Sequence, residues 1–164
     1  MDMRQMCLDW LYVWFAQCAA LVTQVRAETG CGSGAFEADT LAMIAVGRHL
    51  SADRYALHQG RWQQYMIALD EFLADYDFWL TPGGLLARSG EVERLALKSL
   101  EAVPFTQLAN VTGVPAMSVP LHWCDNGLPL GVQFVGGHGD EGRLLSLAAQ
   151  LEEARPWFQR TPQL

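Results

Sequence analysis

The chain has 164 residues, 51% of them hydrophobic and 18% charged, so it can bury a core and lacks the composition of a disordered protein. Its formal net charge of −7 disfavours nucleic acid and anionic membranes as partners. The four cysteines show no CxxC spacing, which argues against a zinc or redox site and predicts reduced, mostly buried thiols in a cytoplasmic protein: Cys7, Cys18, Cys31 and Cys124.

The most apolar stretch, residues 6–25, predicts a buried or interface helix. A membrane span needs about 20 predominantly apolar residues, and Asp9 and three other polar residues interrupt this stretch. A signal peptide is a further alternative, with residues 25–27 as the cleavage site. The leading segment carries no net positive charge, which disfavours it. We expect the buried helix and keep the other two readings open.

Two more helices follow in the first half of the chain. Residues 37–49 predict a short helix, and Ser51 is a good N-cap for a long one, with Asp53 in its first turn. Along the long helix, apolar residues recur at steps of three and four from Trp62 to Tyr76, which is typical of a core-facing helix. Gly60 costs about 1 kcal/mol relative to Ala, so we expect the helix to bend or break there.

The second half of the chain is rich in strand patterns. Residues 77–81 predict a buried strand, and residues 85–103 predict a surface helix. A Gly/Pro-punctuated loop then leads into two alternating strands, 116–121 and 129–135. Asp140 is expected to cap a last helix.

Prolines surround the two alternating strands at positions 115, 120 and 129. Proline removes an N–H donor and fixes φ, so it is costly in a regular ladder. We therefore expect a specialised arrangement, such as strands that end at a cleft.

Three motifs follow one another in the last third of the chain: Asn110-x-Thr112-Gly113-x-Pro115-Ala116-x-Ser118-x-Pro120, Gly127-Leu128-Pro129-x-Gly131-x-Gln133, and Asp140-Glu141 with Leu144-Leu145. Together they resemble the C-terminal end of the amidase signature family, and most of all its members that act on linear or cyclic amides and nylon oligomers. Weaker landmarks of this resemblance lie at residues 36–40 and 76–82.

The resemblance implies an α/β fold with helices packed on part of a mixed β-sheet. It makes residues 1–164 the C-terminal portion of an amidase domain, with residues 1–76 mostly helical and residues 77–164 forming strands plus a C-terminal helix. The sheet would then lack neighbouring strands and present an exposed edge. The large apolar surface left by the missing part predicts association or aggregation, and a homodimer is one form of it.

The family cleaves amides with a serine nucleophile, a second serine in a cis peptide and a lysine base, without metal or organic cofactor. Here none of the six serines is adjacent to another, and the one lysine, Lys98, lies outside the family's lysine motif. We therefore assign no catalytic residue and expect the triad in a missing N-terminal catalytic part. The isolated chain is predicted to be inactive, whereas the full enzyme would hydrolyse a small-molecule amide to acid and amine.

The resemblance places Asn110, Thr112 and Gly113 in a loop near the cleft, where exposed N–H groups could shape the substrate pocket. Turn chemistry alone also explains these residues. Gln133 is expected to bond buried backbone inside the sheet, and Asp140 to cap the last helix, both as structural residues.

Other chemistry is weakly supported. Ser118, His122 and Asp125 contain the residue types of a triad, yet four strand residues span about 13 Å, too far for a direct bond. The histidines have no metal-ligand spacing. Two alternative functions stay open, a non-catalytic interaction domain and a fragment of an aminoacyl-tRNA amidotransferase A-type subunit.

Overall fold

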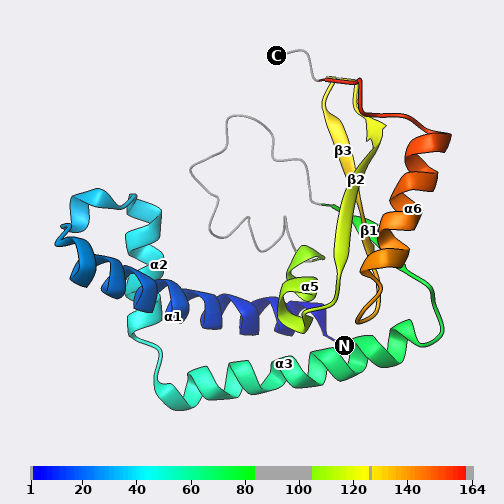
Figure 1. Ribbon diagram of the computed structural model, residues 1–164. Helices are drawn as coiled ribbons and strands as arrows, with labels where there is room; N and C mark the ends of the chain where they lie inside the picture. Colours follow the sequence, from blue (N-terminus) through cyan, green and yellow to red (C-terminus); the bar gives the residue numbers. More distant parts are fainter. Residues whose placement is uncertain (1, 84–104, 126, 162–164) are drawn as a thin grey trace. The chain divides into compact units, whose positions relative to one another are not determined.

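The computed structural model describes residues 2–83, 105–125 and 127–161. The chain divides into two compact units, Met1–Gln64 and Tyr65–Leu164. The first is helical, and the second holds the sheet (Figure 1). The surface helix predicted over residues 85–103 lies outside the described residues.

The first unit is built on α1 (Met3–Thr29), which is longer at both ends than the predicted stretch. Asp2 caps its start by accepting hydrogen bonds from the backbone N–H groups of Arg4 and Gln5, at 2.9 and 3.2 Å. A short 3-10 turn, η1 (Ser33–Ala35), leads to α2 (Ala38–Arg48), which packs on α1.

The two helices cross closely at Gly47. A Cβ atom at this position would lie 2.1 Å from the carbonyl oxygen of Phe15, so only glycine fits there. Beside this crossing, Ala19, Val22 and Ile44 form a buried cluster. Close packing of this kind predicts that α1 and α2 are held together by van der Waals contact as well as by burial.

By length and composition α1 could cross a membrane. The core helix of a soluble protein passes the same test, and seven residues of α1 are buried inside the protein. Its N-terminal half also carries Asp9, whose carboxylate is fully buried among polar partners. This burial agrees with a helix that packs on protein.

The long helix α3 (Ala52–Leu73) runs without interruption through Gly60, so the break expected at this glycine is wrong. The helix-propensity cost of one glycine is about 1 kcal/mol, which the buried residues of the same helix outweigh. At its start, a hydrogen bond with the Ser51 side chain lowers the pKa of Asp53.

The second unit holds a three-stranded sheet in the order β1-β3-β2, with every pair antiparallel: β1 (Trp79–Pro82), β2 (Ala116–Trp123) and β3 (Pro129–Val135). The bounds of β3 are those predicted from its alternation, whereas β2 continues two residues further. The α/β class is confirmed, and the described part of the sheet is antiparallel throughout.

The pairing of β2 with β3 slips between Pro120 and His122. Proline has no N–H to give to a ladder, and within sheets it is found on edge strands and at bulges. Pro120 meets both conditions in the described sheet. The last helix, α6 (Glu141–Ala154), runs alongside this sheet and buries Leu144 (Figure 1).

All four cysteines are free, and Cys7 is buried. The other three are only partly buried, so the expectation of mostly buried thiols is right for Cys7 alone. Burial raises the pKa of the Cys7 and Cys18 thiols, which makes both slow nucleophiles.

Candidate functional site

The segment expected as a loop before β2 is a short helix, α5 (Thr106–Thr112). Gly113 ends it in the left-handed conformation, with φ of 75°, and donates its N–H to the carbonyl oxygen of Ala109 at 2.8 Å. This is the αL type of C-cap. The loop prediction is therefore wrong, because the glycine and the following proline mark the end of a helix.

The two polar side chains predicted near the cleft bond back to their own helix. Thr112 is buried and donates its hydroxyl to the carbonyl oxygen of Leu108 at 2.8 Å. Asn110 is exposed and donates its amide to the carbonyl oxygen of Thr106 at 3.1 Å. The structure thus brings Asn110, Thr112 and Gly113 together at one helix end, where only Asn110 among the three presents a side chain to solvent.

Gln133 lies in the middle strand at a polar row across the sheet, where Thr81 of β1 and Ser118 of β2 are its register partners. Its side-chain amide donates to the Thr81 hydroxyl at 3.0 Å and to the carbonyl oxygen of Phe105 at 3.2 Å. The residue is only 5% exposed. Gln133 therefore ties β3 to β1 and to the segment that begins α5.

Two glycines, Gly83 and Gly131, lie next to this polar row and are packed closely against the Ser118 side chain. Gly83 donates its N–H to the carbonyl oxygen of Gly131 at 2.9 Å. The Ser118 hydroxyl lies against both glycines, since a Cβ atom added at Gly131 would be 2.6 Å from its oxygen. Ser118 is exposed, and close packing against glycine is what fixes its position.

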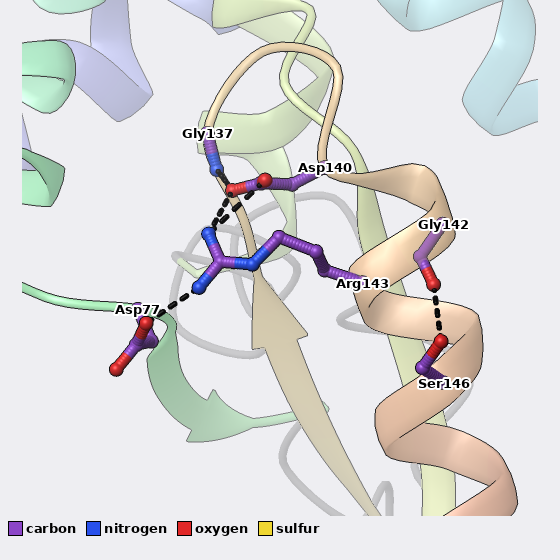
Figure 2. A network of polar contacts seen from close by, with 6 residues as sticks. All are labelled: Asp77, Gly137, Asp140, Gly142, Arg143 and Ser146. Atoms are coloured by element: carbon purple, nitrogen blue, oxygen red, sulfur yellow. Dashed lines mark hydrogen bonds and ion pairs between the residues drawn. The ribbon is translucent and has the colours of Figure 1, made fainter.

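Asp140 stands at the N-cap position of α6, but its carboxylate does not bond the first helical N–H groups. It accepts instead from the backbone N–H of Gly137 at 3.0 Å and from the Arg143 guanidinium at 3.2 Å (Figure 2). Arg143 also donates to Asp77 at 2.5 Å. The carboxylates of Asp140 and Asp77 raise the pKa of Arg143. The network links Asp77, in the segment just before β1, to the first turn of α6.

The sequence analysis did not predict a buried cluster of charged and polar side chains in the helical unit. The Oδ1 atom of Asp9 on α1 accepts from His58 Nδ1 at 2.7 Å and from Arg61 at 2.9 Å, both on α3. Tyr12 stacks on the His58 ring at 4.8 Å. The one available signal was Asp9 inside an apolar helix, because a buried charge needs a partner.

Gln107 on α5 is the other polar group that the sequence did not single out. It is 2% exposed, and neither atom of its side-chain amide has a hydrogen-bond partner in the described part of the chain. Such a group costs about 1–3 kcal/mol when it stays unpaired. No feature of the sequence distinguishes it from a surface glutamine.

The described residues hold no assembled catalytic group of a recognised kind. Ser33 accepts a hydrogen bond from Arg26, and Ser146 donates to the carbonyl oxygen of Gly142. Among these residues no hydrogen bond joins Ser118, His122 and Asp125, and no cluster of three or more His, Cys, Asp or Glu could hold a metal ion. Lys98, Ser89 and Ser99 lie outside the described residues.

A shallow groove in the helical unit adds a surface that the sequence did not predict. Its walls are mostly apolar, and they carry no serine or cysteine. The lining residues are Tyr12, Ala45, Val46, His49, Leu50 and Arg54.

The chain matches the family model described as Amidase over residues 30–145. It is 38% identical over 134 residues to AmiB2 of Mycobacterium tuberculosis, a match that covers 77% of this chain and 29% of that protein. It is also 50% identical over 66 residues to the 6-aminohexanoate-cyclic-dimer hydrolase of Paenarthrobacter ureafaciens, which covers 40% of this chain and 13% of the relative.

Its fold is similar to that in a solved structure of a 6-aminohexanoate cyclic dimer hydrolase, with a TM-score of 0.78 and 25% identity. That likeness covers 94% of this chain and 36% of the hydrolase. The chain thus spans about a third of the structure that it resembles, with its helices and its sheet both included. With the family matched over most of its length, the chain belongs to the amidase signature family.

Proposed function

We propose that this chain supplies the C-terminal part of an amidase that hydrolyses carboxylic amides of small molecules, at C–N bonds outside peptides. One observation carries the proposal: half of the residues are identical over 66 positions to a hydrolase named for a cyclic amide. The family match over residues 30–145 gives the same reaction class.

The nucleophile and its base are assigned to polypeptide outside this chain. An activated serine needs a neighbouring base to take its proton and N–H donors to stabilise the oxyanion. The Ser33 hydroxyl accepts from Arg26 and the Ser146 hydroxyl donates to a backbone carbonyl oxygen, and neither partner can accept a proton from serine at neutral pH. A Ser-Ser-Lys set supplied by the rest of an amidase domain meets the requirement.

In the complete enzyme proposed here, the end of α5 forms part of the wall of the substrate pocket. Asn110 offers an exposed amide there, and Gly113 fixes where the chain turns toward β2. Thr112 is a structural residue that bonds within α5, and Gln133 is a structural residue that ties the start of α5 to the sheet. Asp140 is a structural residue at the start of α6. None of these groups requires a metal or an organic cofactor.

The setting proposed for the enzyme is the cytoplasm, with a small amide as its partner rather than nucleic acid or a membrane. Free thiols and a net charge of −7 support this assignment. The proposal concerns the assembled amidase, and the 164-residue chain alone is expected to be inactive.

The proposal is tested with a chimera in which this chain replaces the matching third of a 6-aminohexanoate cyclic dimer hydrolase. The chimera is expected to hydrolyse the cyclic dimer, and the same chimera without its nucleophilic serine is the control. A folded chimera that is inactive on cyclic, linear and aryl amides would remove the proposal and favour a non-catalytic interaction domain.

The isolated chain is examined in parallel with a serine-reactive fluorophosphonate, read by intact mass. We expect no adduct. A stoichiometric adduct that disappears in Ser118→Ala or Ser33→Ala would show that an activated serine lies within this chain, against the division proposed here.

A further inference from the structure

The helix α1 is apolar on more sides than the helical unit covers. One side packs on α2 through Phe15, Ala19 and Val22, and another meets α3 through the Asp9 cluster. Only 39% of its most apolar window is buried. Part of this apolar surface therefore faces outward.

The exposed residues Trp14 and Leu21, together with the half-buried Trp10, define that outward surface, which we call the tryptophan face. The two indole rings stack at 5.0 Å, and Trp14 is 36% exposed. Leu21 is 60% exposed. At about 100° per residue, these positions fall within about 40° of one another around the helix axis. They therefore lie along one side of α1.

We propose that the tryptophan face is the docking surface for the catalytic part of an amidase fold, the part that carries the nucleophile. The inference rests on the proposed function and adds the place of contact. In the solved hydrolase, the match covers 94% of this chain but only 36% of that enzyme, so the same helix lies in a fold almost three times larger. Apolar surface on the smaller piece is where the larger piece has to pack.

The chemistry of the face fits this occupant better than a lipid bilayer. Tryptophan is enriched among the residues that dominate binding energy at protein interfaces. Insertion of α1 into a bilayer would have to carry Asp9 with it and strip its carboxylate from His58 and Arg61. A charge in the bilayer centre is costly, whereas docking on protein leaves the cluster intact.

The test is co-expression of the tagged 164-residue chain with the part of a 6-aminohexanoate cyclic dimer hydrolase outside the structural match. Capture of that part on the tag is measured for the wild type, Trp14→Glu, Leu21→Glu and Leu57→Glu. Leu57 is the matched control, because it is 55% exposed on α3 in the same unit and lies off the face. Helical content by circular dichroism shows that each variant is folded.

We expect capture by the wild type and by Leu57→Glu, and a loss of about tenfold or more for Trp14→Glu and Leu21→Glu. No capture by the folded wild type, or an equal loss for Leu57→Glu, overturns the inference. So does binding of the wild type to lipid vesicles that Leu21→Glu abolishes, or a wild-type homodimer that Leu21→Glu dissociates without change in capture.

The two proposals fail in different ways. A captured complex that does not hydrolyse amides contradicts the proposed function but supports the docking face. An active chimera that keeps its activity and thermal stability with Leu21→Glu removes the docking face and leaves the function standing.

Discussion

In the part of the chain that the structure describes, a network of aspartate and arginine lies in each unit, and these two networks differ in burial. In the helical unit Asp9 is 0% exposed and accepts from His58, Arg61 and Gln5. In the strand unit Arg143 links Asp77 and Asp140 at the surface, where the Asp77 side chain is 83% exposed. Both networks pair aspartate with arginine, but their expected contributions to the free energy of unfolding are different.

Burial decides this difference because water competes for exposed charges. Exposed ion pairs contribute about 0–1 kcal/mol. Removal of one partner from a buried pair costs about 3–5 kcal/mol, since the other partner keeps its desolvation penalty. The Asp9 cluster should therefore determine whether α1 and α3 stay together, and the Arg143 network should adjust only the local geometry of a surface segment.

The largest effect is expected for Asp9→Leu, which leaves the His58 and Arg61 side chains without their shared acceptor. We expect the free energy of unfolding to fall by about 3 kcal/mol in urea denaturation. The low end of the range applies because Arg61 is partly exposed and can turn toward water.

The double variant Asp9→Leu/His58→Leu is the control for this prediction. With both buried polar partners replaced by apolar groups, stability should return to within about 1 kcal/mol of the wild type. Equal stability of Asp9→Leu and the wild type would mean that the cluster contributes nothing to the free energy of unfolding. The buried network would then stabilise the fold no more than the exposed Arg143 network.

A second pair of variants separates burial from pairing within the strand unit. Gln133 and Gln107 are both buried, but only Gln133 has described partners. Gln133→Met should lower the free energy of unfolding by about 1–3 kcal/mol, because the Thr81 hydroxyl and the Phe105 carbonyl lose a donor. Gln107→Met should raise it, because an unpaired amide is removed. Urea unfolding gives both signs, and destabilisation by Gln107→Met would reveal a partner of that amide.

For the surface network, Asp77→Asn is expected to change stability by less than about 1 kcal/mol. The change should shrink further in 1 M salt, where exposed charges are screened beyond about 3 Å. Thermal unfolding at low and high salt checks this. A loss as large as that of Asp9→Leu would show that Arg143 anchors the fold despite its exposure.

The smallest effect concerns the start of α3. The Ser51 side chain lowers the pKa of Asp53, so this carboxylate stabilises the fold at neutral pH and loses that contribution as the pH falls through its lowered pKa. Ser51→Ala should move the pKa of Asp53 up toward the ordinary aspartate value. Carboxylate NMR titration measures the shift, and an unchanged pKa would contradict the assigned hydrogen bond.

Local patterns in the sequence were sufficient for most of the described elements. Alternation located β3 at its observed bounds, and the steps of three and four residues located α3. The helix α5 was missed because Gly113 and Pro115 were read as loop residues, although a glycine in the left-handed conformation also ends helices. Gly60 was given too much weight, since tertiary burial overrides the propensity of one residue.

The site residues were harder to predict because their partners are distant in sequence. Asp9 could be recognised as an anomaly in an apolar helix, but nothing local identifies His58 or Arg61 as its donors. Likewise Gln133 was expected to bond buried backbone, and its bond to Phe105 fits that, whereas its bond to Thr81 depends on strand order. Contacts of this kind follow from the fold and not from spacing.

The crossing at Gly47 has a consequence for the order in which the protein folds. The α1–α2 contact joins neighbouring helices, whereas the β1–β3 pairing joins Trp79 to Val135, which lie far apart in the sequence. Short loops close at a lower entropic cost, and structures rich in local contacts fold faster. The helical hairpin should thus form before β1 joins β3 in the sheet. During synthesis it would emerge first as well, so the tryptophan face would be displayed before the sheet is complete.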